Sequence, residues 1–292
     1  MVLSTIPITA IVTAHERLEQ TLSTLKVIEM CEPSPSEIVV HVDGRNIPLI
    51  KSIENEFPKA QVIVSETPVG PGGGRNKLIQ AATNDLVASF DDDSYPLDMD
   101  YFGKAFQLFE RFPKAAIICA TLFHRGETIK GAEQSAAWTA DFSGGAAIYR
   151  RVSFLETGGY VPLPIAYGME EADLALRLHA LGGKILQTKW LRVFHDTDLK
   201  RHGNPEITAC SIANLALLTY LRYPRSLWFV GAFQCTRRVL WLLKNGRWRG
   251  VCSGLFMIPG HLKAHRSYRQ RLSNDNVKSY LSLRRTAVPA TF

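Results

Sequence analysis

Residues 86–96 read Leu-Val-Ala-Ser-Phe-Asp-Asp-Asp-Ser-Tyr-Pro, an apolar, β-prone run that leads directly into three carboxylates. Asp91, Asp92 and Asp93 would repel one another at the end of a strand, and a hard divalent cation such as Mg²⁺ or Mn²⁺ would relieve that repulsion. Mg²⁺ typically takes one or two protein carboxylates and completes its shell with water and phosphate oxygens. The stretch therefore predicts a strand that ends in a metal-bridged diphosphate site. A solvated acidic turn that caps a helix is the alternative interpretation.

The segments around this stretch alternate between strand and helix patterns. Strands are predicted at residues 6–13, 37–42, 61–65, 86–90 and 115–121, and helices at 15–30, 48–57, 75–83 and 98–112. Such alternation with short connections predicts an α/β fold, in which a mainly parallel sheet carries helices on both faces. Ligands bind such sheets at the carboxyl ends of the strands, where Asp43 and Asp91–Asp93 fall.

A run of glycines, Gly70-Pro-Gly-Gly-Gly74, is predicted as a loop before the helix that begins near Arg75. It has neither the GK[ST] of a P-loop nor the spacing of a dinucleotide fingerprint. One interpretation is a flexible turn. The other is close approach of the backbone to a ligand, with Arg75 at a helix N-terminus meeting phosphate or ribose.

A third cluster places Glu170, Glu171 and Asp173 at the start of a predicted helix that ends at Gly182-Gly183. Carboxylates are common in a first helical turn because the helix dipole favours negative charge there. The functional alternative is a general base presented from the helix start into a cleft.

Taken together, these segments resemble the inverting glycosyltransferases of family 2, which have the GT-A fold. The resemblance covers roughly residues 6–200 and depends on the order of several segments. These are 9–17 (TAIVTAHER), 41–44 (HVDG), 73–77 (GGRNK), 90–93 (FDDD), 143–151 (SGGAAIYRR), 157–160 (TGGY) and 170–177 (EEADLALR).

The resemblance implies roles for individual residues. The nucleotide-sugar donor would be bound by Thr13, His15, Arg17, Asp43, Arg75, Asp91, Asp92 and Gly145. Asp93 would bind Mn²⁺ or Mg²⁺, and His195 could ligate the same metal or approach the diphosphate. Glu171 would be the catalytic base, with Glu170 as the alternative, because this chain has Glu-Glu where the family commonly has Glu-Asp. A second departure is Gly44-Arg45 after Asp43, where the family usually has an acidic residue and a serine.

Charge divides the chain into two parts. Residues 1–183 carry 15 Lys/Arg and 23 Asp/Glu, whereas residues 184–292 carry 19 Lys/Arg and 4 Asp/Glu. We therefore predict a GT-A catalytic domain over 1–205 and a basic, aromatic-rich helical region over 206–292. Tryptophans among arginines suit a helix lying on an anionic membrane surface. Packing on the catalytic domain, or on a second copy in a homodimer, is the alternative, and no nucleic-acid module is recognisable.

The remaining features favour a cytoplasmic protein, attached at most to the inner face of the cell membrane. Five scattered cysteines without CxxC spacing fit a reducing compartment. The N-terminus lacks the basic region of a signal peptide, and its apolar residues predict a first strand instead.

The expected activity is transfer of a sugar from a nucleotide-diphosphate donor to a hydroxyl of a glycan or lipid-linked glycan, as in surface polysaccharide or glycolipid synthesis. A sugar nucleotidyltransferase is the first alternative, but residues 9–20 contain no glycine where that class usually has a Gly-rich loop. A non-catalytic nucleotide- or membrane-binding protein is the second alternative.

Overall fold

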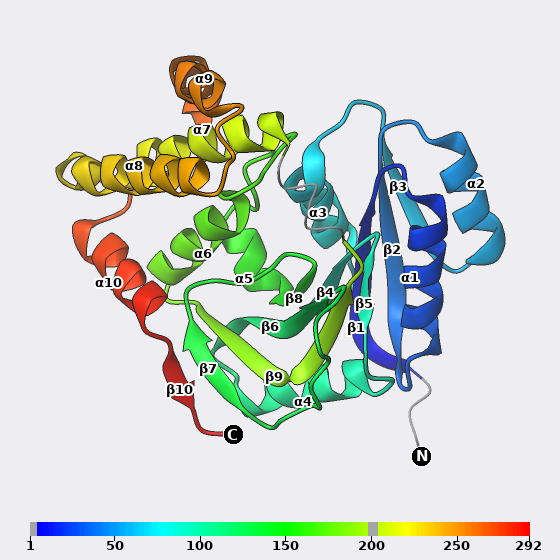
Figure 1. Ribbon diagram of the computed structural model, residues 1–292. Helices are drawn as coiled ribbons and strands as arrows, with labels where there is room; N and C mark the ends of the chain where they lie inside the picture. The colour runs from blue at the N-terminus through cyan, green and yellow to red at the C-terminus, as the bar shows by residue number, and fades with distance from the viewer. Residues whose placement is uncertain (1–4, 198–203) are drawn as a thin grey trace.

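The computed structural model describes residues 5–197 and 204–292, so the whole of the predicted first strand at 6–13 lies within the described residues. In the first third of the chain, strands and helices alternate as the sequence predicts (Figure 1). The elements are β1 (Thr5–Ala14), α1 (Leu18–Met30), β2 (Ser34–Asp43), α2 (Ile47–Glu56), β3 (Gln61–Ser65), α3 (Gly70–Ala81) and β4 (Leu86–Asp91).

The rest of the chain completes the sheet and adds a group of helices. The elements from β5 to β9 are β5 (Ser94–Pro96), α4 (Tyr101–Arg111), β6 (Ala115–His124), β7 (Ala136–Thr139), β8 (Ala146–Arg150), α5 (Arg151–Glu156), α6 (Glu170–Ala180) and β9 (Lys184–His195). They are followed by α7 (Pro205–Arg222), the turn η2 (Arg225–Leu227), α8 (Trp228–Lys244), α9 (Val251–Ala264), the turn η3 (Arg266–Tyr268), α10 (Asn274–Arg285) and β10 (Val288–Ala290).

The sheet has the strand order β10-β7-β9-β6-β8-β4-β1-β2-β3, and β5 pairs with β9. Strands β4, β1, β2 and β3 pair in parallel, so the predicted α/β fold with its parallel central sheet is confirmed. In the register of these strands Thr13 pairs with both His41 and Asp91, and Asp43 pairs with Ser65. The carboxyl ends of β1, β2 and β4 therefore meet at one edge of the sheet.

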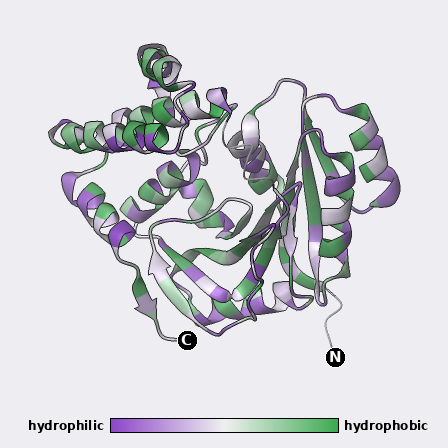
Figure 2. Ribbon diagram, viewed as in Figure 1, coloured by the Kyte–Doolittle hydropathy of each residue, from purple (hydrophilic) through white to green (hydrophobic). Residues whose placement is uncertain are grey.

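Side chains alternate between the two faces of each strand, and each face carries its own core. In Figure 2 much of the length of the central strands has the green of hydrophobic residues. Ile11 and Val87 point into the core formed with α3, α5 and α6. Val12 and Ala88 point into the opposite core, formed with α1, α2 and α4. The sheet is thus the middle of three layers, and its strand ends are held rigidly from both sides.

The C-terminal helices are present as predicted, and part of them packs against the layers around the sheet. The core of α3, α5 and α6 also contains Leu217 and Leu221 of α7 and Tyr280 of α10. Polar contacts add to this packing, because Arg222 of α7 donates to Asp173 of α6 at 2.5 Å. None of the helices in the described ranges combines the length and the apolar composition that a membrane crossing requires.

Candidate active site

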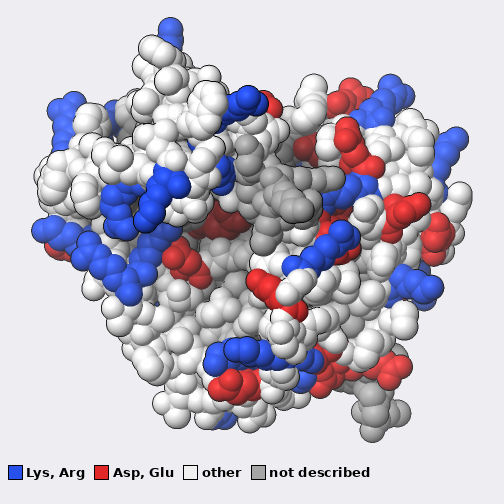
Figure 3. All heavy atoms as spheres, in the orientation of Figure 1, with Lys and Arg blue, Asp and Glu red and all other residues white. Residues whose placement is uncertain are grey.

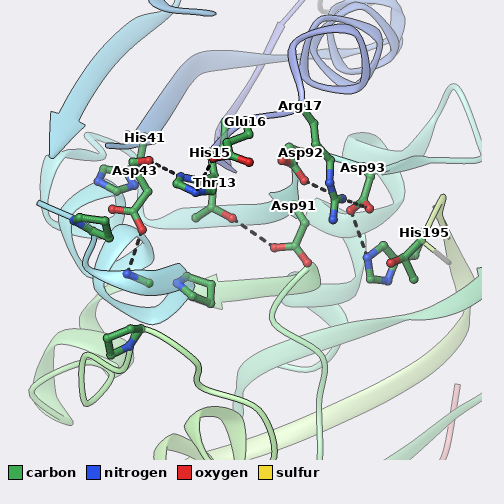
Figure 4. Close-up of a pocket in the computed structure, with 16 residues that line it drawn as sticks. Thr13, His15, Glu16, Arg17, His41, Asp43, Asp91, Asp92, Asp93 and His195 are labelled. Carbon is green, nitrogen blue, oxygen red and sulfur yellow. Dashed lines mark hydrogen bonds and ion pairs between the residues drawn. The ribbon is translucent and has the colours of Figure 1, made fainter. Parts of the chain in front are cut away.

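A cleft of about 750 Å³ lies at the carboxyl ends of β1, β2 and β4. Figure 4 shows side chains from these strands and from the end of β9 pointing into it. Eight of the residues predicted for the donor and metal sites line this cleft, namely Thr13, His15, Arg17, Asp43, Asp91, Asp92, Asp93 and His195. The structure thus gathers residues from four separate segments, as the strand-end argument predicts.

Both carboxylate oxygens of Asp93 have partners in the cleft. It is almost fully buried, and its Oδ1 lies 3.1 Å from Nε2 of His195, while its Oδ2 is paired with the Arg17 guanidinium. Burial alone would raise the pKa of Asp93, but the contacts with His195 and Arg17 outweigh it and lower that pKa. Asp93 is therefore held ionised at the base of the cleft.

The pKa of Asp92 is shifted in the opposite direction to that of Asp93. Its Oδ1 accepts from Nη1 of Arg17 at 3.1 Å. Burial is the largest influence on this carboxyl and, with the charges of Asp93 and Asp91, raises its pKa to about 7 against the opposing effect of Arg17. Burial, with the neighbouring carboxylates, thus makes Asp92 easier to protonate than an ordinary aspartate.

Asp91 links the cleft to a buried arginine. Thr13 Oγ1 donates to Asp91 Oδ1 at 3.1 Å, and Arg75 forms an ion pair with the same carboxylate. Gly145 lies directly against Asp91, with no room for a side chain between them. The predicted donor-site residue Gly145 thus contacts the carboxylate rather than lining the cleft.

Arg75 also lies behind the cleft rather than in it. Its side chain is 3% exposed, and it donates to Ser89 Oγ at 3.1 Å and to Glu170 Oε1 at 3.3 Å in addition to pairing with Asp91. Burial would lower the pKa of Arg75, but the two carboxylates outweigh that effect and raise it. A permanently charged guanidinium therefore joins Asp91 to the Glu170–Glu171 pair.

The two glutamates at the start of α6 have different surroundings. Glu170 is 4% exposed, and its Oε2 has no hydrogen-bond partner among the described residues. Burial, followed by the charge of Glu171, raises the pKa of Glu170 to about 8. Glu171 is only half-buried and accepts from the Gly144 backbone N–H at 3.4 Å, and burial raises its pKa as well. Neither glutamate lines the main cleft, but Glu171 lies next to the Gly144-Gly145 segment that borders Asp91.

The predicted glycine loop is wrong, because Gly70–Gly74 form the first turn of α3. Asp43 accepts from the N–H groups of Val69 and Gly70 at 2.8 and 2.9 Å, and so satisfies donors that a helix start leaves free. A Cβ on Gly72 would lie 2.5 Å from Glu170 Oε2, and one on Gly74 would lie 2.6 Å from Nδ1 of His41. The glycines thus allow close approach to other parts of the protein.

Some residues of the cleft were not predicted from the sequence. His41 was quoted only as part of a motif, and it is buried with its Nε2 2.7 Å from Ser65 Oγ. Pro68, Pro164 and Thr197 also line the cleft. Pro164 is distant in sequence from every strand end of the site, and no local pattern distinguishes it.

The donor atoms of the cleft fit a divalent cation in part. Among the described residues, no three His, Cys, Asp or Glu side chains are arranged as a complete metal site. His195 Nε2 and Asp93 Oδ1 are 3.1 Å apart, and adjacent ligands of an octahedral ion with bonds of about 2.1 Å lie about 3.0 Å apart. This pair can therefore occupy two neighbouring positions of one coordination sphere, with the remaining positions left to water and ligand oxygens.

The sequence of this part of the chain matches a known family. The model described as "Glycosyl transferase family 2" matches residues 9–163, which is more than half of the chain and includes β1, β2, α3 and the Asp91–Asp93 turn. The comparison with curated proteins found no match.

Solved structures share the fold at low sequence identity. GalNAc-T7 with UDP, GalNAc and Mn²⁺ has a TM-score of 0.60 and 15% identity over 75% of this chain, which spans only 48% of that protein. The mannosyltransferase PcManGT from Pyrobaculum calidifontis, in complex with GDP-Man and Mn²⁺, has a TM-score of 0.56 and 11% identity. The match covers 90% of this chain and 73% of PcManGT. TarS 1–349 of S. aureus with UDP-GlcNAc has a TM-score of 0.55 and 13% identity. The match covers 96% of this chain and 91% of the TarS chain.

Proposed function

The chain belongs to glycosyl transferase family 2, and from this membership we propose that it moves a sugar from a nucleotide-diphosphate donor to a hydroxyl acceptor with inversion at the anomeric carbon. The observation that carries the proposal is the cleft at the strand ends, where Asp91–Asp93 lie beside Arg17 and His195. Nucleotides with Mn²⁺ in GalNAc-T7 and PcManGT support a donor of this class, since both proteins share the fold.

The donor diphosphate is proposed to lie above Asp93. Asp93 and His195 would hold Mn²⁺ or Mg²⁺, and Arg17 would meet the negative charge of the phosphates from the side of β1. A divalent cation there supplies Lewis-acid stabilisation of the charge that develops on the leaving diphosphate. Thr13, His15 and Asp43 are proposed to contact the nucleoside, because they line the same cleft at the ends of β1 and β2.

Glu171 is proposed as the base that takes the proton of the acceptor hydroxyl. A base must reach the hydroxyl and must be ionised when it does so. Glu170 meets neither condition well, because it is buried and its pKa of about 8 keeps it protonated near neutral pH. Glu171 is half-buried, so it can be reached more readily, and the hydrogen bond from Gly144 opposes the rise in its pKa that burial causes. One displacement, with base and leaving group on opposite sides of the sugar, inverts the anomeric configuration.

The acceptor is proposed to be a glycan, in particular a lipid-linked one used for surface polysaccharide or glycolipid synthesis on the inner face of a membrane. The support is the exposed surface of α8 and α9, where Phe229 is 70% and Phe256 86% exposed. Figure 3 shows uncharged side chains over much of these helices, with Lys and Arg at their edges. Aromatic and basic side chains together suit the interface of an anionic membrane.

Incubation with a panel of nucleotide-sugars and Mn²⁺ tests the proposal. A transferase with water as a slow acceptor releases nucleoside diphosphate, whereas a sugar nucleotidyltransferase releases pyrophosphate from a sugar phosphate and a nucleoside triphosphate. Release of neither, together with metal-independent nucleotide binding, would favour a non-catalytic binding protein. The configuration of the product at the anomeric carbon, read by NMR, tests inversion.

A further inference from the structure

A second cavity, of about 510 Å³, lies between α7, α8, α10 and the segment that leads into α6. We call it the arginine pocket. Its wall combines four guanidinium groups with aromatic rings, contributed mainly by α8 and α10: Arg237, Arg238, Arg284, Arg285, Phe233 and Trp241. In Figure 3, Lys and Arg side chains gather over these two helices.

The charges of the arginine pocket are largely uncompensated by the protein. None of the described residues that line it is Asp or Glu. Arg284 pairs with Asp141 at 3.1 Å, whereas Arg237, Arg238 and Arg285 form no ion pair within the described part of the chain. Like charges that share a cavity repel one another, and a bound anion would remove that repulsion.

One guanidinium is already oriented for such an anion. Arg238 lies 4.9 Å from the centre of the Trp241 ring and donates from Nε to Ser211 Oγ at 3.3 Å. A side-chain hydrogen bond with Tyr167 adds to these contacts, and together they fix the plane of the guanidinium at the wall of the pocket. Arginine forks match the oxygen pairs of phosphate groups, and several together favour a phosphate or diphosphate over a single carboxylate.

The position of the arginine pocket relates it to the proposed reaction. Tyr167 and Gly168 line it, and Pro164 of the same segment lines the donor cleft. Glu171 follows Gly168 by three residues, so their Cα atoms are separated by at most about 11 Å. The donor cleft and the arginine pocket therefore share one lining segment, and that segment leads directly into the helix that carries the proposed base.

We infer that the arginine pocket binds the phosphate or diphosphate group of the acceptor substrate, an inference that rests on the proposed transferase function. The group could be carried by an isoprenoid lipid or by a water-soluble phosphorylated acceptor. Phe233, which is 62% exposed at the rim, offers an apolar surface for a lipid chain.

Calorimetry with the full-length chain in EDTA tests this inference, with geranyl diphosphate and inorganic pyrophosphate as probes. EDTA removes metal-dependent binding in the donor cleft. Arg237→Gln combined with Arg285→Gln should weaken geranyl diphosphate binding by about tenfold or more, the range expected for lost charged hydrogen bonds. Arg266→Gln, which removes an exposed arginine outside the pocket, is the matched control and should bind like the unmodified chain.

The two probes separate the sources of the phosphate. Equal affinity for both would assign recognition to the phosphates alone, and tighter binding of geranyl diphosphate would assign it to a lipid-linked group; either result supports the inference. Unchanged affinity in the folded double variant, or no binding to the unmodified chain, would overturn it. Nucleoside diphosphate release is measured in parallel, because its absence from every protein would overturn the transferase proposal and leave the binding result intact.

Discussion

At the scale of single residues, the chemistry of the cleft centres on Asp93, whose two oxygens face His195 and Arg17. Asp93→Asn keeps the shape but removes the charge that a cation needs. We expect Mn²⁺-dependent binding of UDP or GDP to weaken by about tenfold or more, as for other disturbances of a metal's surroundings. Calorimetry with and without Mn²⁺ measures this. Asp85→Asn, at the opposite end of β4, is the control, and equal metal dependence in both variants would contradict the assignment.

The two glutamates allow a matched pair of variants. Glu171→Gln should lower kcat by about 10²–10⁴ while leaving donor affinity unchanged, because a missing base affects only the chemical step. Glu170→Gln should retain most activity, since this buried side chain is already protonated near neutral pH. Steady-state transfer assays with one nucleotide-sugar compare the variants. An inactive Glu170→Gln beside an active Glu171→Gln would show that the roles are reversed.

Glu170 also gives stability a pH dependence of definite sign. Its pKa rises from the ordinary 4.5 to about 8 because it is buried and faces Glu171 and Asp91, with Arg75 opposing. Between these values the folded state binds the extra proton, so this group's contribution to stability is full below 4.5 and is lost as the pH rises through about 8. Urea unfolding at pH 6 and pH 9 measures this. The free energy of unfolding of Glu170→Gln, relative to that of the unmodified chain, should be higher at pH 9 than at pH 6. A difference independent of pH would refute this.

At the scale of elements, α6 is held in place by a buried ion network to α7. Asp173 is fully buried between Arg177 of its own helix and Arg222 of α7. Arg222→Ala should lower the free energy of unfolding by about 3–5 kcal/mol, because it leaves part of a buried charge uncompensated. Urea unfolding measures the change, and Arg225→Ala, at an exposed arginine three residues later, is the control. Equal stability of the two variants would show that Arg177 suffices.

The elements also show where prediction from sequence succeeds and where it stops. Strands such as β4 are recognisable because an apolar run ends in charge, and the parallel sheet then places Asp43 and Asp91 at one edge. The first turn of α3 was missed because glycine disfavours helices. The requirement for glycine comes from residues distant in sequence, since Gly72 faces Glu170 and Gly74 faces His41. The burial of Arg75 has the same origin, since its partners lie on other elements.

At the scale of the whole molecule, we expect the positive charge and the exposed aromatic rings of the C-terminal helices to promote binding to anionic membranes. Each Lys or Arg near an anionic surface contributes about 1 kcal/mol, and salt screens that attraction. We therefore expect the protein to sediment with anionic liposomes, to bind neutral ones much less, and to be partly released by high salt.

Point substitutions test membrane binding by α8 and α9 better than removal of the C-terminal helices would. Residues of α7 belong to the core that covers one face of the sheet, and deleting α7 would expose that core. Phe229→Ser combined with Phe256→Ser removes two of the most exposed rings of α8 and α9 without touching buried side chains. If these helices enter the interface, the lost apolar contact should move most of the protein to the supernatant. Leu181→Ser, at an exposed leucine far along the chain from these helices, should leave sedimentation unchanged. Equal sedimentation of both variants would show that α8 and α9 are not the membrane surface and would favour the packing of their exposed face on a second copy.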